Sequence, residues 1–133
     1  MTDFKYVEEW NNACQINNPD EPTIIHEDQG CLMFKLMYEE LLEFKTAIKD
    51  YDKAKKEKLV EILDAFCDIR YLLDGTIRQY GLHEVFDEAL AEVHRSNISK
   101  TVNGVLEIRE DGKILKGQHY FKPDLNKVFK QAA

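Results

Sequence analysis

Two long stretches with helical periodicity, joined by a short charged segment, constrain the fold of this chain more than any other feature of its sequence. Apolar residues recur three and four positions apart over about residues 28–51 and again over about residues 55–80. Asp28 is expected to cap the start of the first helix, and Gly81 to end the second. The segment between them, KDYDKAKKEK, has no apolar period. So short a connection predicts an antiparallel pair of neighbouring helices.

Each of these two helices carries an apolar stripe that is expected to face the protein core. In the first helix the stripe consists of Phe34, Met37, Leu41, Phe44 and Ile48. In the second helix it consists of Leu59, Ile62, Phe66, Ile69, Leu73 and Ile77. The two stripes predict that the helices pack together and bury these side chains.

Shorter elements are expected on either side of this pair. One helix is expected over about residues 3–15, with Trp10 as a core anchor, and another over about residues 82–96. The apolar residues of both recur at helical spacing, so each has one face that can pack against the long helices.

After these helices the period changes to an alternating one. Alternating residues flank Asp111-Gly112, a dipeptide that is typical of two-residue β-hairpin turns. Pro123 and Asp124 are expected to start a short final helix. The sequence therefore predicts a single all-α domain over residues 1–133, an antiparallel bundle of four to five helices with a small C-terminal β-hairpin.

Charge and hydropathy exclude several classes of function. The net charge is −7, and an acidic surface repels phosphate backbones, so binding to nucleic acid is not expected. A nucleotide substrate is compatible with this charge, because a bound divalent cation reverses the local sign. No apolar run approaches the ~18 residues that a membrane-spanning helix needs, and the polar N-terminus MTDFKYVEEW is unlike a signal peptide. We therefore expect a cytoplasmic protein without a membrane anchor.

The cysteines give no sign of a structural cross-link. Cys14, Cys31 and Cys67 are odd in number and form no CxxC motif. This pattern predicts neither a disulfide framework nor a zinc site. We expect three buried thiols in a reducing compartment.

The carboxylates of the two long helices are the candidate functional residues, because positions three or four apart share one face of a helix. One face of the first helix consists of Met33, Leu36, Glu40, Glu43 and Ala47. One face of the second consists of Glu61, Asp64, Asp68, Tyr71, Leu72 and Gly75. Both faces are acidic near the turn and apolar farther away, whereas a purely solvated face normally stays polar along its length.

The register of the hairpin brings the two acidic faces together. With the turn centred near Asp52, Glu43 lies level with Glu61, and Glu40 lies level with Asp64. Asp68 lies one turn beyond. Converging carboxylates repel each other and need a compensating cation. Oxygen ligands favour hard cations, so the expected ion is Mg²⁺, with Mn²⁺ as a substitute, and such a site can hold nucleotide phosphates and polarise a water.

Two other interpretations of these carboxylates compete. Solvated helices often carry ExxE and ExxD spacings without any site, and spacing alone does not separate the two cases. A di-iron bundle would need Glu-x-x-His pairs. The residues three positions before His26, His83, His94 and His119 are Thr23, Tyr80, Ala91 and Lys116, so the sequence contains no such pair.

The chain resembles the all-α nucleoside triphosphate pyrophosphohydrolases, the MazG-like proteins. Their signature of ExxE, followed after a turn by ExxD, occurs here as EELLE and EILD. The closer resemblance is to the MazG-related proteins that are similar to phosphoribosyl-ATP pyrophosphohydrolase. Their motifs match EELLEFKTA, DAFCDIRYLLDGT, RSNISK and DGKILKGQHYFKPDL, in this order, over about residues 33–125.

The resemblance implies Mg²⁺-dependent cleavage of an NTP or dNTP between the α and β phosphates, which gives a nucleoside monophosphate and pyrophosphate. It also implies a homodimer or a dimer of dimers. Carried over to this chain, the metal ligands are Glu40, Glu43, Glu61 and Asp64. Glu40 or Glu43 would orient or deprotonate the attacking water. Asp68 begins the DIRY segment, and whether it or Asp64 takes the key ligand position is left open.

Six residues are candidate contacts to the substrate. They are Lys35, Asn97, Lys100, Lys113, Lys116 and Tyr120. An asparagine supplies an amide to a sugar or base, lysines supply point charges to phosphates, and a tyrosine can stack on a base. Relatives often carry an arginine where CLMFKLMYEE has only Lys35, which leaves the base and sugar open. The alternative to an enzyme is a non-catalytic helical dimer with an acidic surface that binds metal or a partner.

Overall fold

The computed structural model describes residues 2–132, without the side chains of residues 130–132. The described chain contains five helices and one two-stranded antiparallel sheet near the C-terminus. The predicted fold class, mostly helical with a small C-terminal hairpin, is therefore confirmed. The described residues divide into two compact units, Thr2–His83 and residues 84–132. That residues 1–133 form a single domain stays a prediction.

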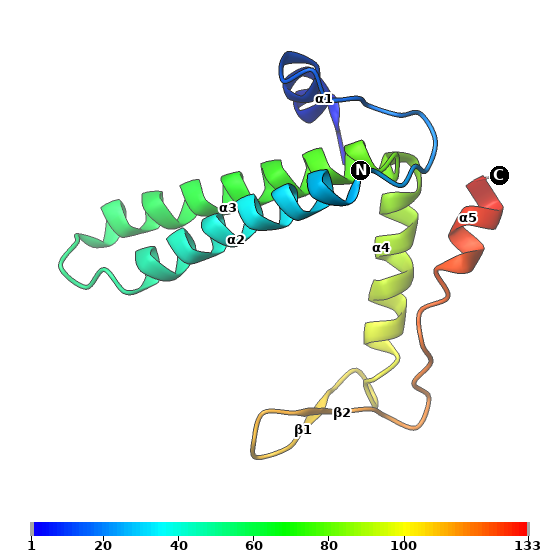
Figure 1. Cartoon of the computed structure of the whole chain (residues 1–133). Coiled ribbons are helices and arrows are strands. Elements are labelled where there is room, and N and C mark those ends of the chain that lie inside the picture. The colour runs from blue at the N-terminus through cyan, green and yellow to red at the C-terminus, as the bar shows by residue number, and fades with distance from the viewer. Residues whose placement is uncertain (1, 133) are drawn as a thin grey trace. The chain divides into compact units, whose positions relative to one another are not determined.

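The first unit is built on an antiparallel pair of helices, α2 (Glu27–Ile48) and α3 (Lys55–Gln79), which lie side by side (Figure 1). We call this pair the hairpin. Met33 and Ala47 from α2 and Ala65 from α3 are buried in its seam, and the Phe44 ring of α2 meets the Phe66 ring of α3 with ring centroids 4.9 Å apart.

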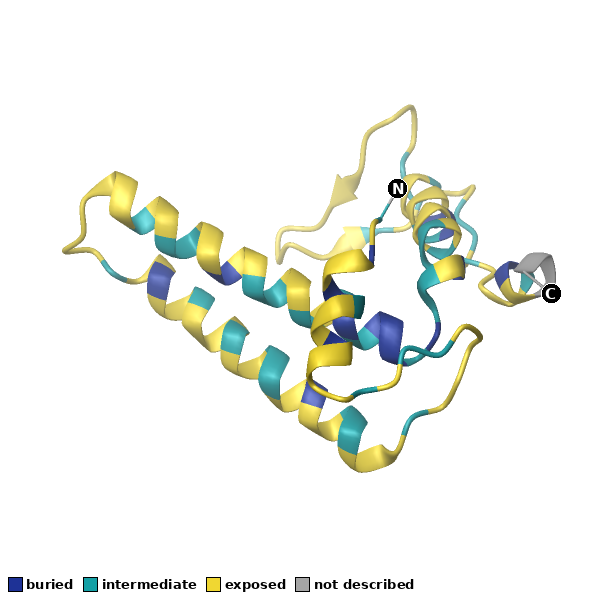
Figure 2. Ribbon diagram, turned by 90° about the horizontal axis from the view of Figure 1, so that it is seen from above, coloured by how far each residue is buried: buried dark blue, intermediate teal, exposed yellow. Residues whose placement is uncertain are grey.

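The apolar stripe predicted to be the core of α2 is mostly not buried. Phe34 is 69 % exposed, Leu41 is 50 % exposed and Ile48 is 44 % exposed. In Figure 2 exposed residues predominate on both helices of the hairpin. The prediction is wrong for these residues because the seam is centred on Met33 and Ala47, so that the large apolar residues turn to one side of it.

The ends of the two helices differ in how well they were predicted. Asp28 is not the cap of α2: His26 takes that position, and its Nδ1 atom accepts a hydrogen bond from the Asp28 N–H at 3.1 Å. Gly81 ends α3 as predicted. Its φ of +65° is left-handed, and a Cβ atom there would lie 2.0 Å from the carbonyl oxygen of Glu21, so only glycine fits.

Helix α1 (Lys5–Ala13) packs against α3 through Val7 and Asn11, which are both buried. The Asn11 side-chain amide donates to the Gly75 carbonyl oxygen of α3 at 3.3 Å and to Asn18 Oδ1 at 2.9 Å. Trp10, the expected core anchor, is instead 55 % exposed. Successive residues of a helix point about 100° apart, so Asn11 is buried against Gly75 of α3, while the Trp10 ring lies beside Tyr71 of the same helix and stays half exposed.

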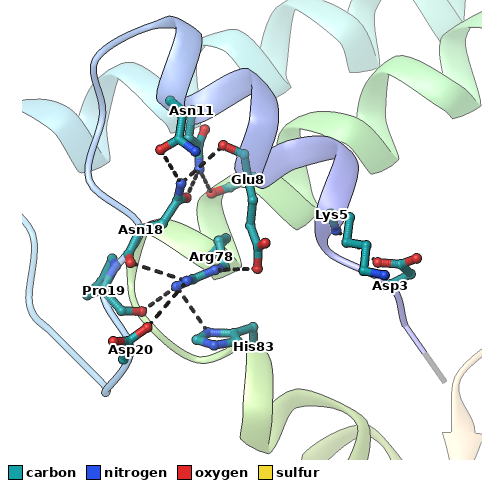
Figure 3. A network of polar contacts seen from close by, with 11 residues as sticks. Asp3, Lys5, Glu8, Asn11, Asn18, Pro19, Asp20, Arg78 and His83 are labelled. Atoms are coloured by element: carbon teal, nitrogen blue, oxygen red, sulfur yellow. Dashed lines mark hydrogen bonds and ion pairs between the residues drawn. The ribbon is translucent and has the colours of Figure 1, made fainter.

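A buried arginine joins α1, the following loop and the end of α3 (Figure 3). The Arg78 side chain is only 7 % exposed. It donates to Glu8 Oε1 at 2.9 Å and to the carbonyl oxygens of Asn18 and Pro19. Its Nη1 atom also lies 3.3 Å from Nδ1 of His83. Because a buried charge is costly unless it is paired, this network fixes the position of α1 on the hairpin.

The second unit contains most of α4 (His83–Ile98), then β1 (Glu107–Ile108), β2 (Ile114–Leu115) and α5 (Asn126–Ala132). Its sheet pairs Glu107 with Leu115 and Ile108 with Ile114. The final helix begins at Asn126, three residues after the predicted Pro123.

The β-hairpin turn is longer than predicted. The Arg109 N–H donates to the Lys113 carbonyl oxygen, and the Gly112 N–H donates to the Arg109 carbonyl oxygen, which encloses a three-residue loop. Gly112 has a φ of +86°, but Asp111 does not have a positive φ. The two-residue turn expected for Asp-Gly needs positive φ at both positions, so the chain adopts the three-residue alternative with a glycine bulge.

Two other expectations concern cysteines and membranes. Cys14, Cys31 and Cys67 are free but exposed, so the prediction that they are buried is wrong. None of the helices in the described part of the chain has the length and apolar character to cross a membrane.

Candidate functional site

The five predicted metal-binding carboxylates line two pockets along one side of the hairpin. The first pocket, of about 510 Å³, is lined by Glu43, Thr46, Ala47, Glu61, Asp64 and Ala65. The second, of about 360 Å³, is lined by Trp10, Leu36, Glu40, Asp68, Tyr71 and Leu72. The predicted acidic faces of α2 and α3 therefore do meet across the seam, with Asp68 among the converging residues.

Glu40 is the most perturbed carboxylate of this group. Burial raises its pKa above the ordinary value, and the negative charges of Asp68, Glu43 and Asp64 raise the pKa further, as does a hydrogen bond with Asp68. Its Oε2 atom is buried and has no hydrogen-bond partner among the described residues. The hairpin thus holds an excess of negative charge that nothing in the described chain neutralises at Glu40.

Glu40 and Asp68 line the same pocket, and after burial the charge of Asp68 is the largest cause of the raised pKa of Glu40, ahead of Asp64, with which the register placed Glu40 level. Side chains on a helix lean toward the helix N-terminus. In an antiparallel hairpin, Glu40 on α2 leans away from the turn while Asp68 on α3 leans toward it. Residues that are offset by one turn along the backbone therefore bring their side-chain ends together.

Lys53, in the loop between α2 and α3, forms an ion pair with Glu61. Its Nζ atom also lies 3.6 Å from Asp50 Oδ2. The sequence interpretation treated this segment as a charged turn and missed the lysine. The sequence position of Lys53 could have indicated this ion pair, because Lys53 lies at the turn end of the two acidic faces, where Coulomb attraction to carboxylates is strongest.

The chemistry of the carboxylates fits a hard divalent cation, although their present geometry is not that of a finished site. All donors are oxygens, and the unpartnered Oε2 of Glu40 would gain a partner from a bound cation. However, among the described residues no three His, Cys, Asp or Glu side chains are already arranged to hold one ion. A metal would therefore require side-chain rotations, and the predicted Mg²⁺ stays a prediction.

Four of the six predicted substrate-binding residues gather in the second unit. Lys100 Nζ donates to Asn97 Oδ1 at 3.2 Å. Lys116 Nζ lies 4.7 Å from the centre of the Tyr120 ring, and Lys100 Nζ lies 6.0 Å from it. Two ammonium groups, an amide and an aromatic ring thus form one cluster, which we call the lysine–tyrosine cluster.

The remaining two predicted substrate contacts are isolated. Lys113 is exposed in the β-hairpin, where its backbone N–H donates to Asp111 Oδ1 at 3.1 Å. Lys35 is exposed on α2, five residues before Glu40 and hence about 140° away around the helix. Their roles stay predictions.

Comparison with known proteins adds one finding. The sequence model of the family described as phosphoribosyl-ATP pyrophosphohydrolase matches residues 12–97. The match contains the whole of the hairpin and all five carboxylates of the two pockets. A comparison with curated proteins found no match. The family resemblance predicted from the motifs is therefore confirmed.

Proposed function

The chain belongs to the phosphoribosyl-ATP pyrophosphohydrolase family, and from that premise we propose that it hydrolyses a nucleoside triphosphate between the α and β phosphates. The products are a nucleoside monophosphate and pyrophosphate. The observation that supports this proposal best is the placement of five carboxylates in two pockets of the hairpin, three in one and two in the other, inside the matched region. Phosphoribosyl-ATP, the substrate in the family's description, is a second candidate because it presents the same triphosphate.

Mg²⁺, or Mn²⁺ in its place, would be held by Glu40, Glu43, Glu61, Asp64 and Asp68. When bound, such an ion polarises phosphoryl oxygens and neutralises their charge. Burial raises the pKa of Glu40, and the neighbouring carboxylates raise it further; a bound cation would relieve this repulsion, which favours binding.

Glu40 or Glu43 orients the attacking water and accepts its proton. Glu40 is favoured as the acceptor because its buried Oε2 atom has no hydrogen-bond partner among the described residues. The lysine–tyrosine cluster binds the substrate, with Lys100 and Lys116 supplying positive charge to the phosphates. Lys35 and Lys113 act as further phosphate contacts.

We also propose that the enzyme is a homodimer or a dimer of dimers. The hairpin exposes a row of large apolar side chains, which we call the open apolar face. It consists of Phe34, Leu41, Ile48, Leu59, Phe66 and Leu73, each between 43 and 69 % exposed. Apolar patches of this extent mark interaction surfaces, and symmetric pairing of identical faces is the commonest way to cover them.

The activity is tested by measuring pyrophosphate release from a panel of NTPs, dNTPs and phosphoribosyl-ATP with Mg²⁺. We expect turnover of at least one nucleotide, and a loss of at least about 100-fold in kcat for Glu43→Gln. Glu57→Gln, an exposed glutamate in the first turn of α3, is the matched control and should behave as wild type. If no nucleotide is hydrolysed and Glu43→Gln matches wild type, the non-catalytic helical dimer becomes the better description.

The assembly is tested separately by light scattering after size exclusion. Leu41→Lys places a charge on the open apolar face and should convert the oligomer to a monomer. Ile24→Lys is the control, because Ile24 is 90 % exposed and lies outside that face. A wild-type protein that is monomeric at tens of micromolar would contradict the proposal.

A further inference from the structure

The exposure of Trp10 and the residues around it are not explained by packing in the protein core. It is a large aromatic residue, yet it is 55 % exposed. It lines the pocket of about 360 Å³ together with Tyr71, and the two rings meet edge to face, 6.2 Å apart with planes inclined by 81°. A flat ring that stands half free beside a pocket offers a surface on which another ring can stack.

The position of this ring is fixed by the contacts of α1. Asn11, the next residue, is 2 % exposed and is tied to the Gly75 carbonyl oxygen of α3. The hydroxyl of Tyr71 donates to the Tyr6 carbonyl oxygen at 3.4 Å, which links the second ring to α1 as well. The helix that carries Trp10 is therefore anchored to α3, and Tyr71 is linked to that helix, before any ligand arrives, which lowers the entropic cost of binding.

The other walls of the pocket differ sharply in character. Leu36 and Leu72 extend the apolar surface beside the aromatic rings. Glu40 and Asp68 also line the pocket, and they belong to the carboxylates that would hold the metal. A ligand that fills this space needs a flat apolar group at one end and an anionic, metal-bound group at the other. A nucleotide has this chemistry.

We propose that the nucleobase of the substrate binds in this pocket, stacked on Trp10 beside Tyr71. The proposal rests on the proposed pyrophosphohydrolase function and names the base subsite of the same site. The phosphates then run from Asp68 toward Glu61, which lies two turns nearer the hairpin loop, about 10 Å along the axis of α3. Recognition by stacking selects a planar ring rather than a particular hydrogen-bond pattern, so several bases are accepted.

The first test uses Trp10 as its own reporter, because it is the only tryptophan in the chain. Its fluorescence is followed during titration with non-hydrolysable α,β-imido nucleoside triphosphates and Mg²⁺, and with inorganic triphosphate and Mg²⁺. We expect saturable quenching by at least one nucleotide and none by inorganic triphosphate, which lacks a base. Equal quenching by both, or no change with any nucleotide, would overturn the proposal.

The second test separates binding from chemistry. Trp10→Ala should raise KM roughly 5- to 150-fold, the range for loss of one base–aromatic stack, with kcat within about twofold of wild type. Trp10→Phe keeps a flat ring, so its KM should lie between those of wild type and Trp10→Ala. Tyr51→Ala is the control, because Tyr51 is an aromatic residue of the hairpin loop that is 82 % exposed. Circular dichroism confirms that each variant is folded.

The two proposals can fail separately. If a nucleotide is hydrolysed and both Trp10 variants keep the wild-type KM, the base binds elsewhere and only the pocket assignment falls. If no nucleotide is hydrolysed but nucleotides alone quench Trp10, the pocket assignment stands and the enzymatic proposal falls. A Trp10→Ala protein with lower kcat and unchanged KM would show a purely structural role and would also overturn the pocket assignment.

Discussion

Two carboxylates of this chain, Glu40 in the hairpin and Glu92 in the second unit, are placed in opposite electrostatic surroundings. Glu92 is 5 % exposed, and it accepts from Arg95 Nε at 3.1 Å, from Lys127 Nζ at 2.8 Å and from the Asp124 N–H at 3.0 Å. These hydrogen bonds lower its pKa to about 2. Glu40 faces other carboxylates, and its pKa is raised.

The difference separates a carboxylate whose charge is balanced by protein groups from one whose neighbours are other carboxylates. Glu92 ties α4 to the segment before α5, and its charge is fully compensated by protein groups. Glu40 has a buried oxygen without a partner and like charges around it. A fold tolerates the second arrangement only at a cost, which is why perturbed carboxylates concentrate at functional sites.

The largest effect is expected for Glu40→Gln. This change removes one of the repelling charges and the proposed proton acceptor while keeping the side-chain shape. We expect kcat for pyrophosphate release to fall at least about 100-fold, with a metal-free Tm equal to or above that of wild type. A Tm several degrees lower would show that Glu40 stabilises the hairpin and would contradict this prediction.

Glu92→Gln is expected to lower the stability of the protein and to leave its activity nearly unchanged. The amide cannot satisfy Arg95 and Lys127 as a carboxylate does, so two cationic groups lose their partner. We expect a Tm lower by several degrees, measured by differential scanning calorimetry, and a kcat within about threefold of wild type. Glu88→Gln, an exposed glutamate one turn earlier on α4, is the control for stability.

The pH dependence of stability should also have opposite signs. The folded pKa of Glu92 is lowered, so its contribution is present above the ordinary carboxylate pKa of about 4.5 and is lost as the pH falls toward about 2. The folded pKa of Glu40 is raised, so its contribution is present below the ordinary value and is lost as the pH rises through the folded pKa. Urea unfolding of wild type, Glu40→Gln and Glu92→Gln between pH 3 and 7 measures how the stability contribution of each glutamate changes with pH. Parallel curves for the three proteins would contradict the assignment.

The smallest effect is expected for Lys53→Met. Lys53 pairs with Glu61 and competes with a metal for that carboxylate. Exposed ion pairs contribute little, so we expect only a roughly two- to fivefold gain in apparent Mg²⁺ affinity, measured from the Mg²⁺ concentration that gives half-maximal rate. Lys49→Met, which changes a neighbouring exposed lysine, should leave this concentration unchanged. A weaker Mg²⁺ affinity for Lys53→Met would show that Lys53 supports the site.

Local patterns predicted the parts of the fold that depend on neighbours in sequence. The two long helices and their acidic faces follow from the spacing of residues. The end of α3 at Gly81 follows from the positive φ that a glycine adopts easily. Predictions that needed a three-dimensional neighbour were less successful. Phe34 and Leu41 belong to an apolar stripe that is real but points away from the seam, and Trp10 lies at a pocket rather than in the core.

The sequence by itself determined that this chain forms a helical hairpin with carboxylates on one side, because helical period and charge are properties of the chain alone. Tertiary structure decided which carboxylates meet. Glu40 and Asp68 line one pocket because the side chains of antiparallel helices lean in opposite directions. Tertiary structure also decided that Trp10 stands beside this acidic pair, since Asn11 and Arg78 dock α1 onto α3.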